Sequence, residues 1–419
     1  MHDSSAGLRH VIIGNGVAGT ICAETLRKLD PLSDVTLIGG EPYPLYNRVA
    51  LPPFLKGKAL EKKVIMRSRD DHANKGIKLH LETWVTRVCA QDKVVYTDGA
   101  AFPYDRLLVA TGGRPRLPDL PGVAGTSGVF NFQTLDDTKA IIAQAEQVTS
   151  AVVFGGSYIA YELAEALSER GLNVTWIMRG PRLLHRILDV EGGAVVDAIA
   201  RQHGVNMLYN DRVAEVQSRD GKIAGVTTVS GKQIETGMLC CGLGFDYNTE
   251  ILEGTGIHLN QAIIADEYLR TAVPNIFAAG DVAEAKNLMT GEHEVMGTWD
   301  SATTHGRLAA RNMLGENVPF DDPSVYTSTM FHTKMRAVGR VPHHTDANYS
   351  SISQTDIAKQ THFKLLFEKD VLVGAIAVGN MPRRAELLHL IRSHEPVTDK
   401  HRLLAPEERR TAAAQPDAE

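Results

Sequence analysis

The sequence predicts an α/β protein built from two Rossmann-like dinucleotide-binding domains and a small C-terminal α+β domain. Two observations carry this prediction: the order strand, helix, strand occurs twice along the chain, and in both places a glycine-containing turn joins the first strand to the helix. Length supplies a third observation, since 419 residues correspond to roughly three domains of ordinary size.

The two units are recognised by their hydrophobic periodicity. Short apolar runs alternate with stretches in which apolar residues recur at helical spacing, and this order favours a parallel sheet. The predicted strand, helix and strand cover residues 11–13, 17–29 and 35–38 in the first unit, and 151–154, 157–169 and 174–177 in the second. Two such units predict two nucleotide sites.

The first nucleotide site begins at Gly14, Gly16 and Gly19, which follow a strand and open a helix. Glycines at this spacing permit a tight turn, close approach of the backbone to a pyrophosphate, and packing of the helix on the strand. Glu41 follows Gly19 by 22 residues, the spacing of an acid that accepts a hydrogen bond from a ribose hydroxyl. The alternative is that the glycines only make a tight turn.

The second nucleotide site departs from this pattern. Gly155 and Gly156 are present, but Ser157 stands at the second motif glycine and Ala160 at the third, and the serine adds a side chain where backbone should meet pyrophosphate. The second strand ends without an acid, and Arg179 there offers a cation suited to a ribose 2′-phosphate. We therefore expect NADPH in preference to NADH; the alternative is a solvated Arg179 that selects neither.

Proline and glycine mark the expected crossovers between domains. Residues 112–122 are rich in both, which indicates a crossing from the first domain to the second, and a return crossing is expected after Gly244. The predicted division is a discontinuous first dinucleotide-binding domain at 1–118 and 246–318, a second dinucleotide-binding domain at 119–245, a C-terminal α+β domain at 319–404 and a disordered tail at 405–419.

Composition argues against several classes of function. A net charge of -6 and a pI near 6.2 provide no overall basic surface for nucleic acid or an anionic membrane. The four cysteines are not spaced as a disulfide framework, which predicts a cytoplasmic protein. No apolar run of about 18 residues occurs, so no integral membrane segment is expected. No metal or iron–sulfur site is expected from the cysteine and histidine spacing, and Cys240 and Cys241 are interpreted as buried packing residues.

Two further segments carry a family resemblance when they are combined with the N-terminal glycine motif. Residues 104–112 end in Ala-Thr-Gly, and residues 271–281 end in Ala-Ala-Gly-Asp. Over about residues 11–315 the chain resembles the pyridine nucleotide-disulfide oxidoreductase superfamily of FAD enzymes. The resemblance implies that Thr111 and Gly112 mark the exit from the FAD domain, and that Gly280 and Asp281 bind the ribityl-phosphate region. The alternative for Asp281 is a helix N-cap.

The segment of residues 40–49, followed by 55–57, is similar to the FAD-binding part of assimilatory nitrite reductases and their electron-transfer subunits, with rubredoxin and ferredoxin reductases as near relatives. This similarity implies that Arg48 lies by the flavin or its pyrophosphate, and that the helix entered near Trp299 approaches the flavin ring. The alternative for Arg48 is an ordinary surface arginine.

The same resemblance gives possible roles to two residues of the second predicted helix. Tyr158 matches an aromatic residue that covers the flavin until nicotinamide displaces it, and Glu162 matches a carboxylate near both rings. Either residue could equally be a plain helix residue. The cysteine motifs of the disulfide-reducing relatives are missing from the sequence, so electrons are not expected to leave through a protein thiol.

These observations predict an FAD-dependent NAD(P)H oxidoreductase. Electrons are expected to pass from nicotinamide through flavin to a separate acceptor, either a small iron–sulfur protein of the ferredoxin or rubredoxin kind or a partner reductase subunit. One alternative is an FAD subunit that does not use NAD(P)H and is fed by another donor or faces quinone. Another is a flavin-stabilised, non-catalytic interaction protein. The C-terminal domain is open to two uses, a homodimer interface or a docking surface.

Overall fold

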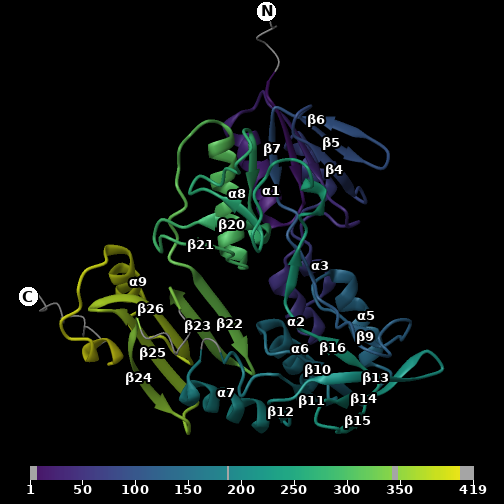
Figure 1. The fold of residues 1–419 in the computed structure, drawn as a ribbon, viewed down its shortest axis with the longest axis vertical. Coiled ribbons are helices and arrows are strands. Elements are labelled where there is room, and N and C mark those ends of the chain that lie inside the picture. Colours follow the sequence, from purple (N-terminus) through teal and green to yellow (C-terminus); the bar gives the residue numbers. More distant parts are fainter. Residues whose placement is uncertain (1–6, 186–187, 342–347, 406–419) are drawn as a thin grey trace, which may run out of the picture. The chain divides into compact units, whose positions relative to one another are not determined.

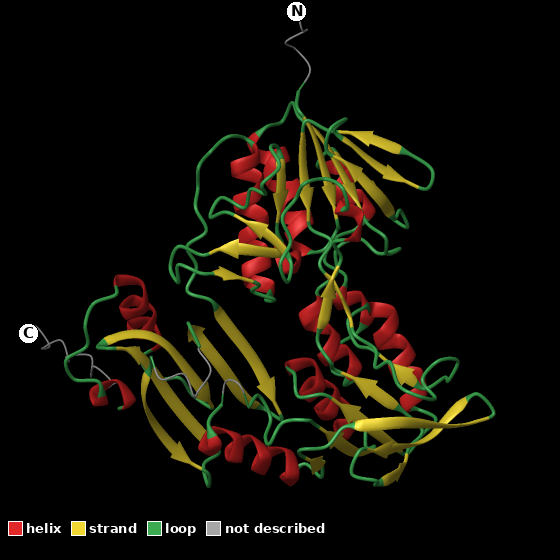
Figure 2. Cartoon of the chain, in the orientation of Figure 1, coloured by secondary structure: helices red, strands yellow, loops and turns green. Residues whose placement is uncertain are grey.

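The computed structural model confirms the predicted α/β fold (Figures 1 and 2). It describes residues 7–185, 188–341 and 348–405. The chain divides into two compact units, Met1–His185 with Ala200–Val325, and Arg186–Ile199 with Tyr326–Glu419. The finer division into FAD, NAD(P) and C-terminal domains stays a prediction.

The first sheet contains five parallel strands in the order β19-β7-β1-β2-β3. Their bounds are β1 (Arg9–Ile13), β2 (Asp34–Ile38), β3 (Ile77–His80), β7 (Arg106–Val109) and β19 (Ile276–Ala278). The strand β19 comes from a segment far along the chain, so the chain passes through the second sheet before it returns to complete the first one.

Both faces of the first sheet are covered, which explains its continuous apolar strands. On one face Ile12 and Leu37 pack under α1 (Val17–Leu29) and α8 (Trp299–Met313). On the other face Val11 and Ile13 pack under a three-stranded antiparallel sheet of β4 (Val85–Cys89), β5 (Val94–Thr97) and β6 (Ala101–Pro103). Because side chains alternate along β1, Ile12 packs into the core on one face of the sheet, and its neighbours Val11 and Ile13 pack into the core on the other face.

The second sheet is also parallel, in the order β12-β11-β10-β16-β9. Its strands are β9 (Val129–Phe130), β10 (Ser150–Phe154), β11 (Asn173–Ile177), β12 (Asn206–Leu208) and β16 (Leu239–Cys241). The helices α5 (Leu135–Ala145) and α6 (Tyr158–Glu169) belong to the same unit as this sheet, and so does a smaller sheet of β13 (Val213–Arg219), β14 (Lys222–Thr228) and β15 (Gln233–Glu235). Helix α7 (Val190–Gln202) lies mostly in the second unit.

Cys240 and Cys241 are both buried in β16, as the sequence predicts. Cys241 packs in the core beneath the β13–β15 sheet. Adjacent side chains on a strand point to opposite faces, so the two thiols do not form a pair, and all four cysteines are free thiols. Burial raises the pKa of the Cys241 thiol to about 12, which makes it unreactive.

The second unit contains a five-stranded sheet in the order β22-β23-β26-β25-β24, with α9 (Arg384–Ser393) beside β26. The strands are β22 (Val325–Met330), β23 (Thr333–Gly339), β24 (Ser350–Asp356), β25 (Thr361–Glu368) and β26 (Val371–Val378). Asp189, just before α7, is paired with Lys364 of β25 at 3.0 Å. Of the tail predicted as disordered, all but Ala405 lies outside the described residues.

The remaining elements are short and belong to the first unit, apart from one at the end of the chain. They are η1 (Arg48–Ala50), α2 (Leu51–Leu55), α3 (Glu61–Val64), α4 (Arg69–Asn74), β8 (Gly113–Pro115), β17 (Phe245–Tyr247), η2 (Glu250–Leu252), β18 (Ile263–Ala265), η3 (Gly280–Val282), β20 (Ala283–Lys286), β21 (His293–Glu294) and η4 (His401–Leu404). In the described part of the chain, no helix has the length and apolar character needed to span a bilayer.

Candidate functional site: two glycine turns in one chain

The first glycine turn, residues 14–19, joins β1 to α1. Gly14 has φ 107°, and a Cβ there would lie 2.1 Å from the Ala110 carbonyl oxygen; a Cβ on Gly19 would lie 1.9 Å from the Gly14 carbonyl oxygen. Both positions therefore require glycine for backbone packing. Gly16 differs, since no protein atom lies within 4 Å of the position of its Cβ. That open space at a helix N-terminus fits a pyrophosphate, which the free N–H groups can bind.

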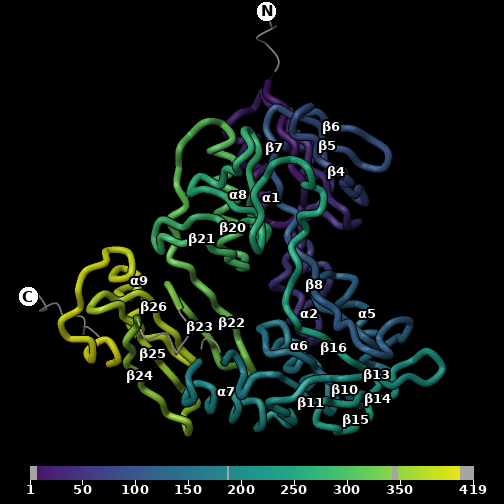
Figure 3. Tube along the Cα trace, viewed as in Figure 1, coloured from purple at the N-terminus to yellow at the C-terminus, as the bar shows by residue number. Residues whose placement is uncertain are grey.

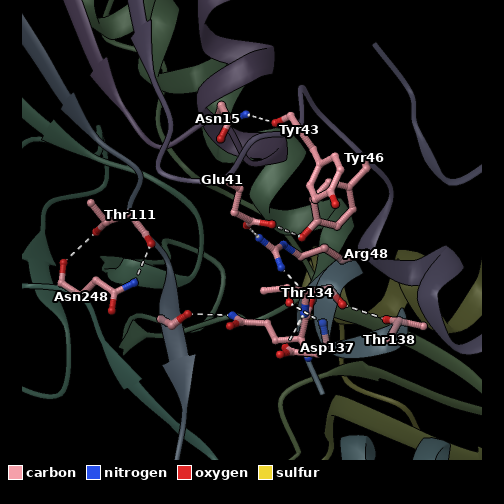
Figure 4. A network of polar contacts seen from close by, with 12 residues as sticks. Asn15, Glu41, Tyr43, Tyr46, Arg48, Thr111, Thr134, Asp137, Thr138 and Asn248 are labelled. Carbon is pink, nitrogen blue, oxygen red and sulfur yellow. Dashed lines mark hydrogen bonds and ion pairs between the residues drawn. The ribbon is translucent and has the colours of Figure 1, made fainter. Parts of the chain in front are cut away.

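Asn15 ties this turn to the segment that follows β2 (Figure 4). Its amide donates to the Tyr43 carbonyl at 2.8 Å. Gly39 lies against the same side chain, because a Cβ on Gly39 would be 2.2 Å from Asn15 Oδ1. The asparagine inside the glycine motif therefore fixes the path of the chain leading to Glu41.

Glu41 is half-buried and accepts two hydrogen bonds from its own segment (Figure 4). Arg48 Nη2 lies 2.6 Å from Glu41 Oε1, and the Tyr46 hydroxyl donates to Oε2 at 2.7 Å. The predicted ribose acid is thus already paired, although each carboxylate oxygen keeps a second lone pair for a ribose hydroxyl. Arg48 also donates to the Gln133 carbonyl at 2.7 Å, which joins this segment to the chain just before α5.

Asp281 lies inside η3, directly after the first sheet's last strand. The N-cap of η3 is Ala279, so the alternative role of Asp281 as a helix cap is not observed. Solvent reaches the Asp281 carboxyl, but the protein atoms packed around it partly desolvate it and raise its pKa, while the charge of Arg48 acts in the opposite direction. Desolvation lowers the pKa of Arg48, but Tyr46, Glu41 and Asp281 raise it above its usual value. Arg48 and Asp281 are therefore close enough to interact electrostatically.

His305, on α8, fixes the glycine before Asp281. Gly280 has φ 75°, and its N–H donates to His305 Nδ1 at 3.3 Å. The imidazole is fully buried and meets the Phe320 ring edge to face at 4.4 Å between centroids. Burial lowers the pKa of His305 to about 4, so near neutral pH the ring is uncharged and Nδ1 is free to accept. Trp299, the first residue of α8, is half-buried and follows the N-cap Thr298.

The two predicted crossovers are joined side by side (Figures 3 and 4). Strand β8 pairs with β17 in antiparallel fashion. At the first-sheet end, the Thr111 hydroxyl donates to the Asn248 carbonyl at 2.8 Å, and the Asn248 amide donates to the Thr111 carbonyl at 2.9 Å. Gly112 follows with φ 62°. The Ala-Thr-Gly segment is therefore hydrogen-bonded, at the point where the chain leaves the first sheet, to the segment by which the chain returns.

The second glycine turn, residues 155–160, has the same position between β10 and α6 but different contacts. The Ser157 hydroxyl donates to the Gly242 carbonyl at 2.9 Å and accepts from the Ala160 N–H at 3.3 Å, so Ser157 caps α6. A Cβ on Gly242 would lie 2.7 Å from the Ala160 nitrogen. The close packing expected from a third motif glycine is thus provided by Gly242 of the opposing strand segment, a residue that the sequence reading missed.

Tyr158 and Glu162 lie on the first two turns of α6, four residues apart on one face. Both are half-buried, and burial raises the pKa of the Tyr158 hydroxyl. The Tyr158 ring meets Tyr161 edge to face, with centroids 6.1 Å apart. The structure therefore places the two residues together, while their roles toward flavin and nicotinamide stay predictions.

The end of β11 carries the residues expected to select the nucleotide. Met178, at the place of the missing acid, is buried, and Arg179 is exposed. Gly156 lies across from Met178, with 3.8 Å between its Cβ position and the methionine Cβ. His185 approaches the same loop, because a Cβ on Gly180 would lie 2.5 Å from His185 Nδ1. A second nitrogen-bearing side chain therefore lies near Arg179, which the sequence alone did not reveal.

Helix α2 and the residues after it connect the first sheet's segment to α6. Lys56 pairs with Glu165 at 2.7 Å, where both side chains are largely buried, and Lys58 pairs with Glu169 at 2.5 Å. Arg170 also donates to the Leu55 carbonyl. This region, which lacks cysteine, therefore uses its lysines in ion pairs. Across the described ranges, no group of three His, Cys, Asp or Glu side chains is arranged to bind a metal.

A family model for pyridine nucleotide-disulphide oxidoreductases matches residues 8–306, and the chain belongs to that family. Members bind FAD and NAD(P)H. Curated relatives include the nitrite reductase [NAD(P)H] of Bacillus subtilis, 27% identical over 94% of this chain and 48% of the relative, and putidaredoxin reductase of Pseudomonas putida, 28% identical over 89% of this chain and 88% of the relative.

Among solved structures, the covalent putidaredoxin reductase–putidaredoxin complex matches with a TM-score of 0.87 and 25% identity, covering 96% of both chains. By contrast, the chain spans only about half the length of the nitrite reductase and of the assimilatory nitrate reductase electron transfer subunit of Bacillus subtilis, 48% and 51% respectively.

Proposed function

We propose that this chain is an FAD-containing oxidoreductase that carries electrons from NAD(P)H to a separate protein acceptor. The observation that carries the proposal is the open space at Gly16. At Gly14 and Gly19 backbone atoms occupy the place where a Cβ would lie, whereas no protein atom lies within 4 Å of that place at Gly16. FAD supplies the chemistry when bound, because flavin accepts two electrons together and releases them singly.

The residues of the chain have distinct parts in this proposal. The N–H groups after Gly16 bind the pyrophosphate, and Glu41 accepts from a ribose hydroxyl while Arg48 keeps it oriented. Asp281 accepts from a ribityl hydroxyl. On α6, Tyr158 would contact the flavin ring at the place where nicotinamide binds, and the carboxylate of Glu162 would help to orient both rings.

The second glycine turn binds the electron donor in this proposal, with NADPH preferred. A ribose 2′-phosphate needs cations and is repelled by an acid; Met178 replaces the acid, and Arg179 is exposed beside it. His185, in the same loop, adds a second nitrogen donor when it is protonated.

The acceptor is proposed to be a small iron–sulfur protein or a partner reductase subunit. Support comes from relatives whose names state such acceptors: putidaredoxin reductase, rubredoxin-NAD(+) reductase and the ferredoxin reductase component of a p-cumate dioxygenase system, the last 31% identical over 78% of this chain. A homodimer through the C-terminal domain and a cytoplasmic location stay predictions.

The test is anaerobic mixing of the FAD-loaded protein with NADPH or with NADH, followed by addition of a ferredoxin or rubredoxin. We expect NADPH to bleach the flavin absorbance faster than NADH does, and the iron–sulfur protein to restore it. Failure of both nucleotides to bleach the flavin would favour the second candidate, an FAD subunit fed by another donor, which the serine in the second glycine turn supports.

A further inference from the structure

Trp84 is an exposed aromatic residue in the loop between β3 and β4. The residue is 68% exposed, although indole rings are usually well covered in folded proteins. One part of the ring lies on the backbone of Gly40, because a Cβ there would be only 2.7 Å from Cε2 and Cζ2 of the indole. Glycine at position 40 therefore lets the ring lie against the chain, and most of its area still faces solvent.

The loop carrying Trp84 is fixed to the segment that follows β2. The Thr83 N–H donates to the Gly39 carbonyl at 3.0 Å, and the Glu82 N–H donates to the Glu41 carbonyl at 3.3 Å. Gly39 in turn contacts Asn15 inside the first glycine turn. The backbone hydrogen bonds of Glu82 and Thr83 thus hold the loop of the exposed indole next to the proposed ribose acid and to the segment that contacts the proposed pyrophosphate site.

This position is at the carboxyl edge of the first parallel sheet, where α/β proteins bind their ligands. A dinucleotide whose pyrophosphate lies at Gly16 and whose ribose reaches Glu41 extends its base further along the same edge. We propose that Trp84 is the stacking platform for the adenine ring of that dinucleotide. This inference rests on the proposed function, because it assumes that the first glycine turn binds FAD.

The chemistry of the two rings supports this occupant. Stacking of a base on an aromatic side chain needs only an exposed ring face and changes affinity by roughly five- to a hundredfold. It also covers apolar surface that Trp84 otherwise exposes to water. A purely structural role explains the contact with Gly40 but leaves the 68% exposure without a reason.

The experiment compares FAD with FMN, which lacks the adenine, in binding to flavin-free protein. For Trp84→Ala we expect the Kd for FAD to rise about tenfold or more while the Kd for FMN changes less than about twofold. Trp84→Phe keeps a ring and is expected to bind FAD within about threefold of the unmodified protein. Leu117→Ala, at another exposed apolar residue, is the control.

A second readout is tryptophan fluorescence, since stacking quenches the indole. The unmodified protein should lose more emission on FAD binding than Trp84→Phe does, although Trp176 and Trp299 remain in both. If Trp84→Ala binds FAD as tightly as the unmodified protein, or loses FAD and FMN affinity equally, the adenine platform is ruled out. Failure of the unmodified protein to bind FAD at all overturns the proposed function instead.

Discussion

The two glycine turns share one order of elements but use their middle position differently. In the first turn, Gly16 faces open space, whereas in the second, Ser157 places a hydroxyl there and uses it to cap α6. The residue after the second strand of each unit differs too: it is the acid Glu41 after β2 and the buried Met178 after β11. The first turn thus leaves its backbone open to a ligand, as the proposed function requires, whereas the second turn uses the same position to cap its own helix.

This difference teaches that the glycine pattern combines separable tasks. Gly14, Gly19 and Gly155 are required by nearby backbone, with contacts of 2.2 Å or less to a Cβ that they lack. No protein atom near Gly16 requires a glycine at the middle position, so under the proposed function only the ligand requires it, and the residue there can change without loss of fold. Packing between helix and strand can also move to another residue, as Gly242 shows.

The strongest test of the comparison is Gly16→Val. The backbone of Gly16 has φ -65°, which valine adopts without strain, and its side chain would enter space that no protein atom occupies. We expect the fold to be kept and the Kd for FAD to rise by about a hundredfold or more, corresponding to roughly 3 kcal/mol. Binding is measured by flavin fluorescence, and folding by circular dichroism.

Gly99→Val is the matched control, because Gly99 also has open space around its Cβ position but lies in a turn away from the proposed site. It should bind FAD normally. Equal losses in both variants would mean that valine harms the protein generally, and unchanged FAD binding in Gly16→Val would refute the assignment of the first turn.

The sequence predicted the elements of both turns because their signals are local. Residues 17–29 were expected as a helix and α1 spans Val17–Leu29, while the second predicted helix begins one residue before α6. The partners of these elements could not be predicted in the same way. Gly242 lies 85 residues from Ser157, and His305 lies 25 residues from Gly280, so only folding brings them together. Trp84 carries no motif and is recognised by its exposure.

The next prediction concerns His305, which fixes the Gly280 loop of the first site. Its native pKa is about 4 against an ordinary value of 6.5, so between these values the unfolded chain binds a proton that the native protein does not. Stability therefore falls as the pH drops from 6.5 towards 4, by up to roughly 3 kcal/mol from this residue. Unfolding by urea across this range measures the slope.

In His305→Gln we expect that part of the slope to disappear, while the amide oxygen still accepts from Gly280 and FAD binding at neutral pH is kept. His10, buried with a pKa also lowered to about 4, contributes equally in both proteins, so the difference isolates His305. An unchanged slope would show that His305 is protonated in the native protein.

Arg179→Ala tests the second turn's preference for NADPH. Removing one charged donor from a phosphate is expected to raise the Kd for NADPH about tenfold and leave NADH unchanged. Arg219→Ala, at another exposed arginine of the first unit, is the control and should alter neither. Equal weakening of NADPH and NADH by Arg179→Ala would indicate contact with a part common to both nucleotides.

The smallest effect is expected at Ser157, where the comparison between the turns is most direct. Ser157→Ala removes the cap of α6 and should cost about 1 kcal/mol in the free energy of unfolding, while Ser157→Gly, which restores the usual motif residue, should cost only a few tenths. Because the hydroxyl proton is directed to Gly242, we expect the alanine variant to bind NADPH within about twofold of the unmodified protein. A tenfold weaker Kd with unchanged stability would instead mean that the hydroxyl turns to the phosphate, and that the second turn, like the first, is organised by its ligand.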